Sequence, residues 1–300
     1  MASSITNELA VNGIALLPDL LTADQLRAMK VGFDARLRRM RWNNSNGYEK
    51  TERYRHMVED VLLLDQGFVD AALNPAVTIA LREYIGGSFE LVEAKGWKSL
   101  PTTRDFHGWH GDAWYDQNLV RDRIPREVKL GIFLTDVNSG GFVYVKGTHG
   151  TQHPRSLSQA ELNRFLPDQI AHVNGPAGSA FLFDTSGFHR QSVPILQPRE
   201  AVFYAYHDPS VPLQREDIEY NRYHPLLLNA AFLGQLSDED RRILGFGNRI
   251  NFRPGHQRAQ QHTRFQKAIR QCHDAIVLWD EFRERVQGKL KRHKRSEKKS

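Results

Sequence analysis

Apolar residues in the N-terminal part of the chain recur every three or four positions, which is the spacing of one buried helix face. Leu26, Met29 and Phe33 belong to such a series. Thr22 precedes the series and is followed three positions later by a glutamine, as in a capping box. The pattern predicts an amphipathic helix that follows a short extended segment at residues 13–17.

Helical spacing returns after a polar stretch at residues 41–58, which the pattern predicts to be a loop. Between Val61 and Ile85, apolar residues again lie three and four positions apart. We expect further helix here. The candidate buried positions are Val69, Ala72, Val77, Ala80 and Leu81.

From about residue 89 the pattern changes to short apolar runs separated by Gly, Pro, Asn and Asp, which is typical of strands. The predicted strands are Phe89–Lys98, Val128–Leu134, Gly141–Val145, Ala180–Phe183 and Val202–His207. Several short strands without a glycine-rich phosphate-binding motif favour a sandwich or barrel over alternating βαβ units.

Beyond Pro212 the pattern is helical once more. A short helix is predicted over residues 237–244, with Ser237 as its N-cap. A longer helix over residues 265–286 has an apolar face that includes Cys272, which we interpret as a packing residue.

Composition agrees with a globular protein, because 40% of the 300 residues are hydrophobic and 25% are charged. The formal net charge of +6 lies in the last twelve residues, 289–300, where seven Lys or Arg face the single acid Glu297. We therefore expect one domain over residues 1–288, followed by a disordered basic tail. A tail that binds nucleic acid is the less favoured interpretation, because the rest of the chain carries no charge excess.

The single cysteine excludes an internal disulfide and a cysteine-rich zinc site. Residues 1–21 lack the basic start and long apolar run of a signal peptide. No stretch approaches the roughly 18 uncharged apolar residues of a membrane-spanning helix. We expect a cytoplasmic protein without a membrane partner.

The strongest chemical signal lies in residues 106–112, Phe-His-Gly-Trp-His-Gly-Asp. His110 and Asp112 are separated by one residue, so on an extended backbone their side chains point to the same face. His189 follows the predicted strand at 180–183 and a turn, which would carry it into the same cavity. Two imidazoles and one carboxylate form the facial triad of non-haem Fe(II) sites, which leaves three coordination positions open.

Each residue by itself is a weak signal, because a chain with 13 histidines contains such pairs by chance. Arg199 follows His189 by ten residues, at the head of a predicted strand. A guanidinium there would recognise a carboxylate through two hydrogen bonds, or would pair with Glu200 at the surface. The ordered set of residues is more specific than any one member.

In this order the motifs resemble those of the iron(II)- and 2-oxoglutarate-dependent dioxygenases, and among them the phytanoyl-CoA dioxygenase (PhyH) family. The resemblance covers about residues 10–207 and rests on Trp109–Asp112, Asn138–His149, His189 and Arg199. Lys146 and Thr148 stand where the family usually has Pro and Ser. These departures affect the assignment to a subfamily more than the mechanism.

The resemblance implies a mainly β fold with flanking helices, whose core is a double-stranded β-helix, or jelly roll, over about residues 89–207. A helical extension would occupy about residues 213–288. It also implies an enzyme that uses Fe(II), 2-oxoglutarate and O2 to hydroxylate a small organic molecule, such as a secondary metabolite or an acyl- or amino-acid-like compound, with release of succinate and CO2. The implied iron ligands are His110, Asp112 and His189.

The resemblance further implies that Arg199 binds the distal carboxylate of 2-oxoglutarate. Lys98 would donate a further hydrogen bond to 2-oxoglutarate, or would be a solvated lysine at a strand end. Ser192, three residues after His189, would reach the same cofactor. The candidate substrate-binding residues are Phe106, His107, Trp109, Trp114 and Tyr115, some of which would instead be ordinary core residues.

Two other functions stay open at this point. The jelly roll could be a non-catalytic module that binds a metal or a ligand, although all three residues of the triad are present. The basic tail could direct an oxygenase to nucleic acid, although no basic stripe supports this. We favour a small-molecule substrate.

Overall fold

The computed structural model divides the chain into two compact units, Met1–Asn251 and Phe252–Ser300. The structure describes residues 2–38, 54–58, 61–112, 127–150, 156–163, 165, 167–210 and 236–245. The predictions for the helix at 265–286, for Cys272 and for the tail at 289–300 lie outside these described residues.

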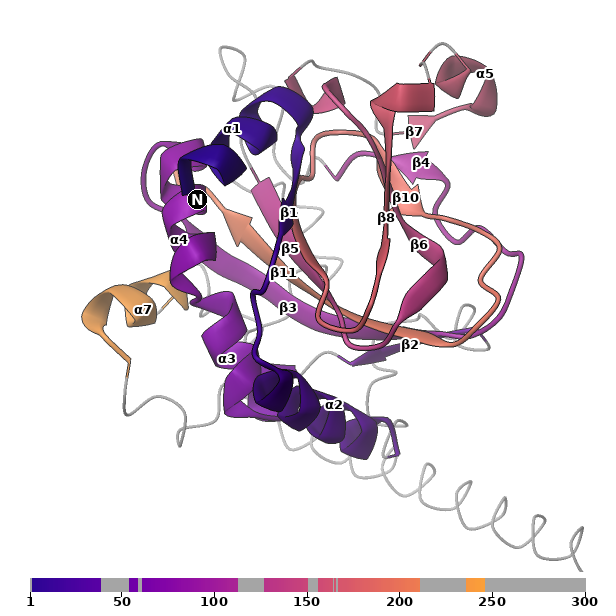
Figure 1. Ribbon diagram of the computed structural model, residues 1–300. Coiled ribbons are helices and arrows are strands. Elements are labelled where there is room, and N and C mark those ends of the chain that lie inside the picture. The colour runs from indigo at the N-terminus through magenta and orange to yellow at the C-terminus, as the bar shows by residue number, and fades with distance from the viewer. Residues whose placement is uncertain are drawn as a thin grey trace, which may run out of the picture. The chain divides into compact units, whose positions relative to one another are not determined.

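Two antiparallel sheets form the centre of the first unit (Figure 1). The larger sheet has the strand order β1-β9-β5-β11-β3-β2, with β1 Ile14–Leu17, β9 Ala180–Asp184, β5 Glu127–Phe133, β11 Arg199–His207, β3 Glu90–Ser99 and β2 Arg55–Val58. The smaller sheet has the order β7-β4-β10-β6-β8, with β7 Ser156–Leu157, β4 Trp109–His110, β10 His189–Gln191, β6 Val137–Val145 and β8 Ile170–Gly175. The predicted mainly β jelly roll with flanking helices is confirmed, and its two sheets do not close into a barrel.

Helices cover the outer face of the larger sheet, on the side away from the smaller one (Figure 1). The helices before the core are α1 Ala2–Asn12, α2 Ala23–Leu37, η3 Val61–Leu63, α3 Gln66–Ala72 and α4 Pro75–Ile85. Short helices later in the chain are η4 Thr148–Gly150, α5 Gln159–Leu162, η5 Pro167–Gln169 and α7 Asp238–Ile243. None of the helices in the described residues is long and apolar enough to span a membrane.

Helix α2 begins as its sequence predicts. Thr22 forms a capping box with Gln25, and each satisfies a backbone N–H of the first turn. Met29 and Phe33 are fully buried, Met29 beside Gly67 of helix α3 and Phe33 against the sheet. The ring of Phe33 occupies the space that a side chain at Gly96 would need, so the glycine lets the helix approach strand β3 closely.

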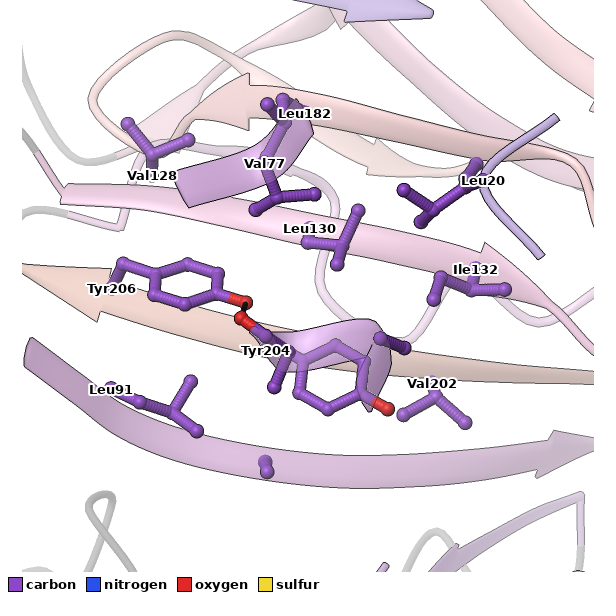
Figure 2. Close-up of a cluster of buried hydrophobic side chains, with 14 of the residues drawn as sticks. Leu20, Val77, Leu91, Val128, Leu130, Ile132, Leu182, Val202, Tyr204 and Tyr206 are labelled. Carbon is purple, nitrogen blue, oxygen red and sulfur yellow. Dashed lines mark hydrogen bonds between the residues drawn. The ribbon is translucent and has the colours of Figure 1, made fainter. Parts of the chain in front are cut away.

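The outer core lies between the helices and the larger sheet and consists mainly of aliphatic side chains. Three phenylalanines and three buried tyrosines belong to it, and Figure 2 shows two of the tyrosines, Tyr204 and Tyr206. Val77 of α4 packs here with Leu130 of β5. The hydroxyl of Tyr206 donates to the carbonyl oxygen of Ala72 at 2.7 Å, which satisfies this polar group within the core. This packing fixes the sheet on which the site is built.

The inner core lies between the two sheets and is aromatic. The ring of Phe142 of β6 lies tilted against those of Phe181 and Phe183 of β9, with ring centroids 4.8 Å and 4.5 Å away. Phe133 and Tyr144 belong to the same buried cluster. These rings fill part of the space between the sheets.

Several local predictions differ from the structure. Strand β2 lies within the stretch predicted to be a loop, and helix α1 and the strands β4, β7, β8 and β10 were not predicted. Strands β2 and β8 are edge strands, whose positions depend on pairing with β3 and β6 rather than on their own apolar pattern. The helical stretch at 61–85 is divided into η3, α3 and α4, because Asp65 and Asn74 each cap a new helix.

Candidate metal and cofactor site

The structure brings His110, Asp112 and His189 together. Strands β4 and β10 pair so that His110 lies directly opposite His189, and their ring centroids are 4.6 Å apart. Asp112 Oδ1 lies 3.5 Å from His110 Nε2, and Asp112 Oδ2 lies 3.5 Å from His189 Nε2. One ligand atom from each of the three residues lies within 4.8 Å of the others, as a single metal ion requires.

The two imidazoles are oriented in the same way. Nδ1 of His110 donates to the carbonyl oxygen of Gly108 at 3.0 Å, and Nδ1 of His189 donates to that of Gly187 at 2.9 Å. Because a carbonyl only accepts, each Nδ1 carries the proton and each Nε2 offers a lone pair. Both Nε2 atoms face Asp112, so the three residues present the nitrogen and oxygen donors that a divalent metal needs.

Charged neighbours keep Asp112 ionised. Burial alone would raise the pKa of Asp112, but the Lys129 ammonium, 2.8 Å from Oδ2, and the two imidazoles hold it well below its usual value. Burial and the proximity of His189 lower the pKa of His110, which favours the neutral, metal-binding imidazole. The protonation states of Asp112 and His110 therefore fit those of metal ligands.

Further carboxylates surround Lys129. Burial acts to lower its pKa, but Asp112, Glu93 and Glu127 together raise it, so the ammonium stays charged. Glu93 also accepts a hydrogen bond from Lys95 at 2.6 Å. The wall formed by β3 and β5 therefore carries paired charges rather than apolar groups.

Arg199, at the start of β11, lines the same cavity as the three candidate metal ligands. Its side chain is buried, and Nε and Nη1 have no hydrogen-bond partner within the described part of the chain. Burial and the nearby Arg55 guanidinium lower the pKa of Arg199 to about 9, so it is charged at neutral pH. Nε2 of Gln191, another lining residue, is also buried without a partner there. A buried cation and a neighbouring amide without an acceptor fit an anionic ligand.

These residues line one cavity of about 430 Å³. The three candidate metal ligands, Arg199 and Gln191 are among its lining residues. Charged side chains outnumber apolar ones in this lining. The other lining residues are Arg55, Glu93, Lys95, Trp97, His107, Gly111, Glu127, Lys129, Phe142, Phe183, Arg190, Phe203 and Ala205.

Lys98 and Ser192, expected to bind the cofactor, do not line this cavity. Lys98 lies opposite Glu200 in the β3–β11 pairing and donates to it at 3.0 Å on the outer face of the sheet. Because side chains alternate along a strand, Lys95 and not Lys98 faces the cavity. The backbone N–H of Ser192 donates to Gly141, and Gln191 lines the cavity in its place.

Of the five residues expected to bind the substrate, His107 lines the cavity. Although part of its ring is exposed, desolvation and the Arg55 guanidinium lower the pKa of His107 to about 3, and the two side chains are 2.5 Å apart. Phe106 is half-buried outside the lining, near the guanidinium of Arg55. Trp109 is buried in a separate cluster with Phe188, so it is a packing residue. The remaining two, Trp114 and Tyr115, lie outside the described residues.

A jelly roll that holds two imidazoles and one carboxylate beside a buried guanidinium has the arrangement of non-haem Fe(II) oxygenases. Residues 9–192 match the model of the phytanoyl-CoA dioxygenase (PhyH) family. The chain belongs to the phytanoyl-CoA dioxygenase family, and the predicted enzyme class, a dioxygenase that depends on Fe(II) and 2-oxoglutarate, is confirmed.

Solved structures with the same fold have low sequence identity to this chain. HygX from Streptomyces hygroscopicus, solved with nickel, 2-oxoglutarate and hygromycin B, is 17% identical, with a TM-score of 0.53 over 74% of this chain and 94% of its own. EctD from S. alaskensis, solved with 2-oxoglutarate and 5-hydroxyectoine, is 18% identical, with a TM-score of 0.57 over 71% and 78%. No curated protein matches the chain. These structures support the fold of the present chain.

Proposed function

We propose that His110, Asp112 and His189 hold the catalytic Fe(II) and that Arg199 binds the distal carboxylate of 2-oxoglutarate. The observation that carries this proposal is the clustering of these four residues in one cavity. Iron and 2-oxoglutarate, when bound, supply the oxidising power that hydroxylates a substrate C–H bond with O2, as 2-oxoglutarate becomes succinate and CO2.

The protein's own groups bind and orient the reactants. The guanidinium of Arg199 has donors without a partner in the described residues that can bind a carboxylate, and Gln191 adds an amide donor nearby. The backbone carbonyls at Gly108 and Gly187 fix the two imidazoles, so Nε2 of each is ready to bind metal. The buried aromatic layer beside His189 limits the access of water, with Phe183 5.0 Å from its ring.

We further propose that the substrate is a polar, ionised small molecule rather than a long acyl chain. Once the residues assigned to iron and 2-oxoglutarate are set aside, the cavity is still lined by Arg55, Glu93, Lys95 and Glu127. An acyl chain would desolvate these charges without replacing their hydrogen bonds, which is costly. The Arg55 guanidinium lies over the Trp97 ring, 3.7 Å from its centroid, so this aromatic residue is paired with a cation rather than left as an apolar surface for an acyl chain.

The test combines metal binding with turnover. Fe(II) is titrated anaerobically into the full chain, and succinate release is then measured against amino acids, sugars, other polar natural products and acyl thioesters. His110→Ala should abolish metal occupancy and succinate release. His107→Ala, which removes an imidazole from the same cavity, should retain the metal. Full iron occupancy in His110→Ala would refute the ligand assignment, and activity only on acyl thioesters would refute the substrate class.

The compartment and the tail are separate proposals. We expect the enzyme to act in a reducing cytoplasm, because its single cysteine suggests no disulfide framework. We expect binding to nucleic acid to play no part in catalysis. Succinate release that requires nucleic acid and disappears when residues 289–300 are deleted would contradict this.

A further inference from the structure

Lys129 places a buried cation beside the proposed metal ligands. Its Nζ donates a hydrogen bond to Asp112 Oδ2 at 2.8 Å, and the two side chains are only 12% and 10% exposed. Asp112 follows the two-residue strand β4 and lies outside it. Lys129 lies in β5, which pairs with β9 on one side and β11 on the other. The hydrogen bond therefore ties a carboxylate beyond the end of a short strand to the interior of the larger sheet.

We propose that Lys129 is a positioning residue that restricts Asp112 to binding the metal through one oxygen. This inference rests on the proposed function, in which Asp112 is a ligand. Each oxygen of Asp112 lies 3.5 Å from one imidazole Nε2, Oδ1 from that of His110 and Oδ2 from that of His189. The two oxygens differ in that the Lys129 ammonium donates its hydrogen bond to Oδ2. An oxygen that shares its charge with an ammonium is a weaker metal ligand than its neighbour.

The number of oxygens that Asp112 offers decides how many coordination positions remain. Three ligand atoms leave three positions, which are enough for the two donor atoms of 2-oxoglutarate and for O2. A carboxylate that bound through both oxygens would occupy one of them. By holding Oδ2, Lys129 keeps this position available to the co-substrates.

An alternative role for Lys129 is purely electrostatic. A cation close to a metal site weakens the binding of a divalent metal, so its removal would tighten binding without any change in coordination. The positioning role instead predicts a changed coordination sphere and weaker chelation by 2-oxoglutarate. The two roles can therefore be separated by measuring a spectrum together with an affinity.

The experiment uses the full chain loaded with Co(II), whose visible absorption reports the number and arrangement of its ligands. Lys129→Met removes the ammonium and keeps most of the side-chain volume. We expect an altered Co(II) spectrum and a dissociation constant for 2-oxoglutarate that rises roughly tenfold, because loss of a contact that orients a metal ligand typically costs about 10- to 100-fold in metal affinity or activity. Lys95→Met is the matched control, because Lys95 lines the same cavity but donates to Glu93 at 2.6 Å. It should keep the native spectrum and affinity.

A native Co(II) spectrum in folded Lys129→Met, with equal or tighter metal binding, would overturn the positioning role and leave the proposed function intact. If the native chain itself binds no Co(II), the proposed function fails instead. Should Lys129→Met not fold, Lys129→Gln takes its place, because its amide nitrogen stands one bond closer to the backbone and falls short of Asp112. A native spectrum and affinity in that variant would overturn the proposal equally.

Discussion

Replacing Arg199 with methionine tests the proposed cofactor site most directly. Nε and Nη1 of its guanidinium are buried without a partner in the described residues. A guanidinium binds a carboxylate through two parallel N–H donors. A hydrogen bond to a charged group contributes about 1.5–3 kcal/mol, so the loss of two costs about 3–6 kcal/mol. Since 1.4 kcal/mol is a tenfold change, the dissociation constant of 2-oxoglutarate should rise at least roughly 100-fold.

The ligand-free Arg199→Met protein, in contrast, should be at least as stable as the native chain. The folded state buries the charge of Arg199, and this burial lowers its pKa to about 9. Removal of a desolvated cation relieves that cost, so Arg199→Met without ligand should melt at or above the native temperature. Weak binding of 2-oxoglutarate can then not be attributed to misfolding.

The assay is anaerobic calorimetric titration of 2-oxoglutarate into the Ni(II)-loaded chain. Lys98→Met is the control, because Lys98 donates to Glu200 on the outer face of the sheet and Lys30 still reaches Glu200 at 2.9 Å. It should bind 2-oxoglutarate within about twofold of the native chain. A dissociation constant within threefold of native for Arg199→Met, or a large loss for Lys98→Met, would refute the reasoning.

Three further predictions concern the metal and the core. Ni(II) at about 100 times its dissociation constant should stabilise the native chain against thermal unfolding by about 2.7 kcal/mol. A chelator, or the substitution His189→Ala, should remove this gain. An equal gain in His189→Ala would contradict the role of His189 as a ligand. Phe33→Ala should lower the free energy of unfolding by about 3–5 kcal/mol in urea, because the ring is fully buried against Gly96; a loss below about 1 kcal/mol would contradict this packing. Tyr84→Phe should cost about 1–3 kcal/mol in the same assay, because it removes the 2.7 Å hydrogen bond to buried Asp184, and unchanged stability would argue against that bond.

Local signals predicted the elements whose stability is local. The capping boxes at Thr22 and Ser237 start helices in the structure where the sequence predicts them. Five strands of the core also lie where short apolar runs between turn residues predict them, with shifts of a few residues at their ends. Such signals depend on residues only a few positions apart in the chain, so they can be recognised without tertiary structure.

Elements that depend on a distant partner were not predictable in this way. Strand β2 carries two partly exposed residues and pairs along only one edge, with β3. Its sequence is polar enough to resemble a loop, and its hydrogen bonds come from a strand about forty residues later. Trp109 illustrates the same limit for side chains, because an aromatic residue beside a metal ligand could equally line a cavity or fill the core.

The sequence by itself determined the ligand types and the family, because His110 and Asp112 are neighbours on one backbone segment and the distal motifs follow in a fixed order. Only the tertiary structure decided which charged residues face the cavity. Arg199 and Glu200 are adjacent, yet one faces the cavity and the other the outside, where Lys98 meets it. The physical reason is strand register, since a shift of one residue in the pairing moves every side chain of a strand to the opposite face.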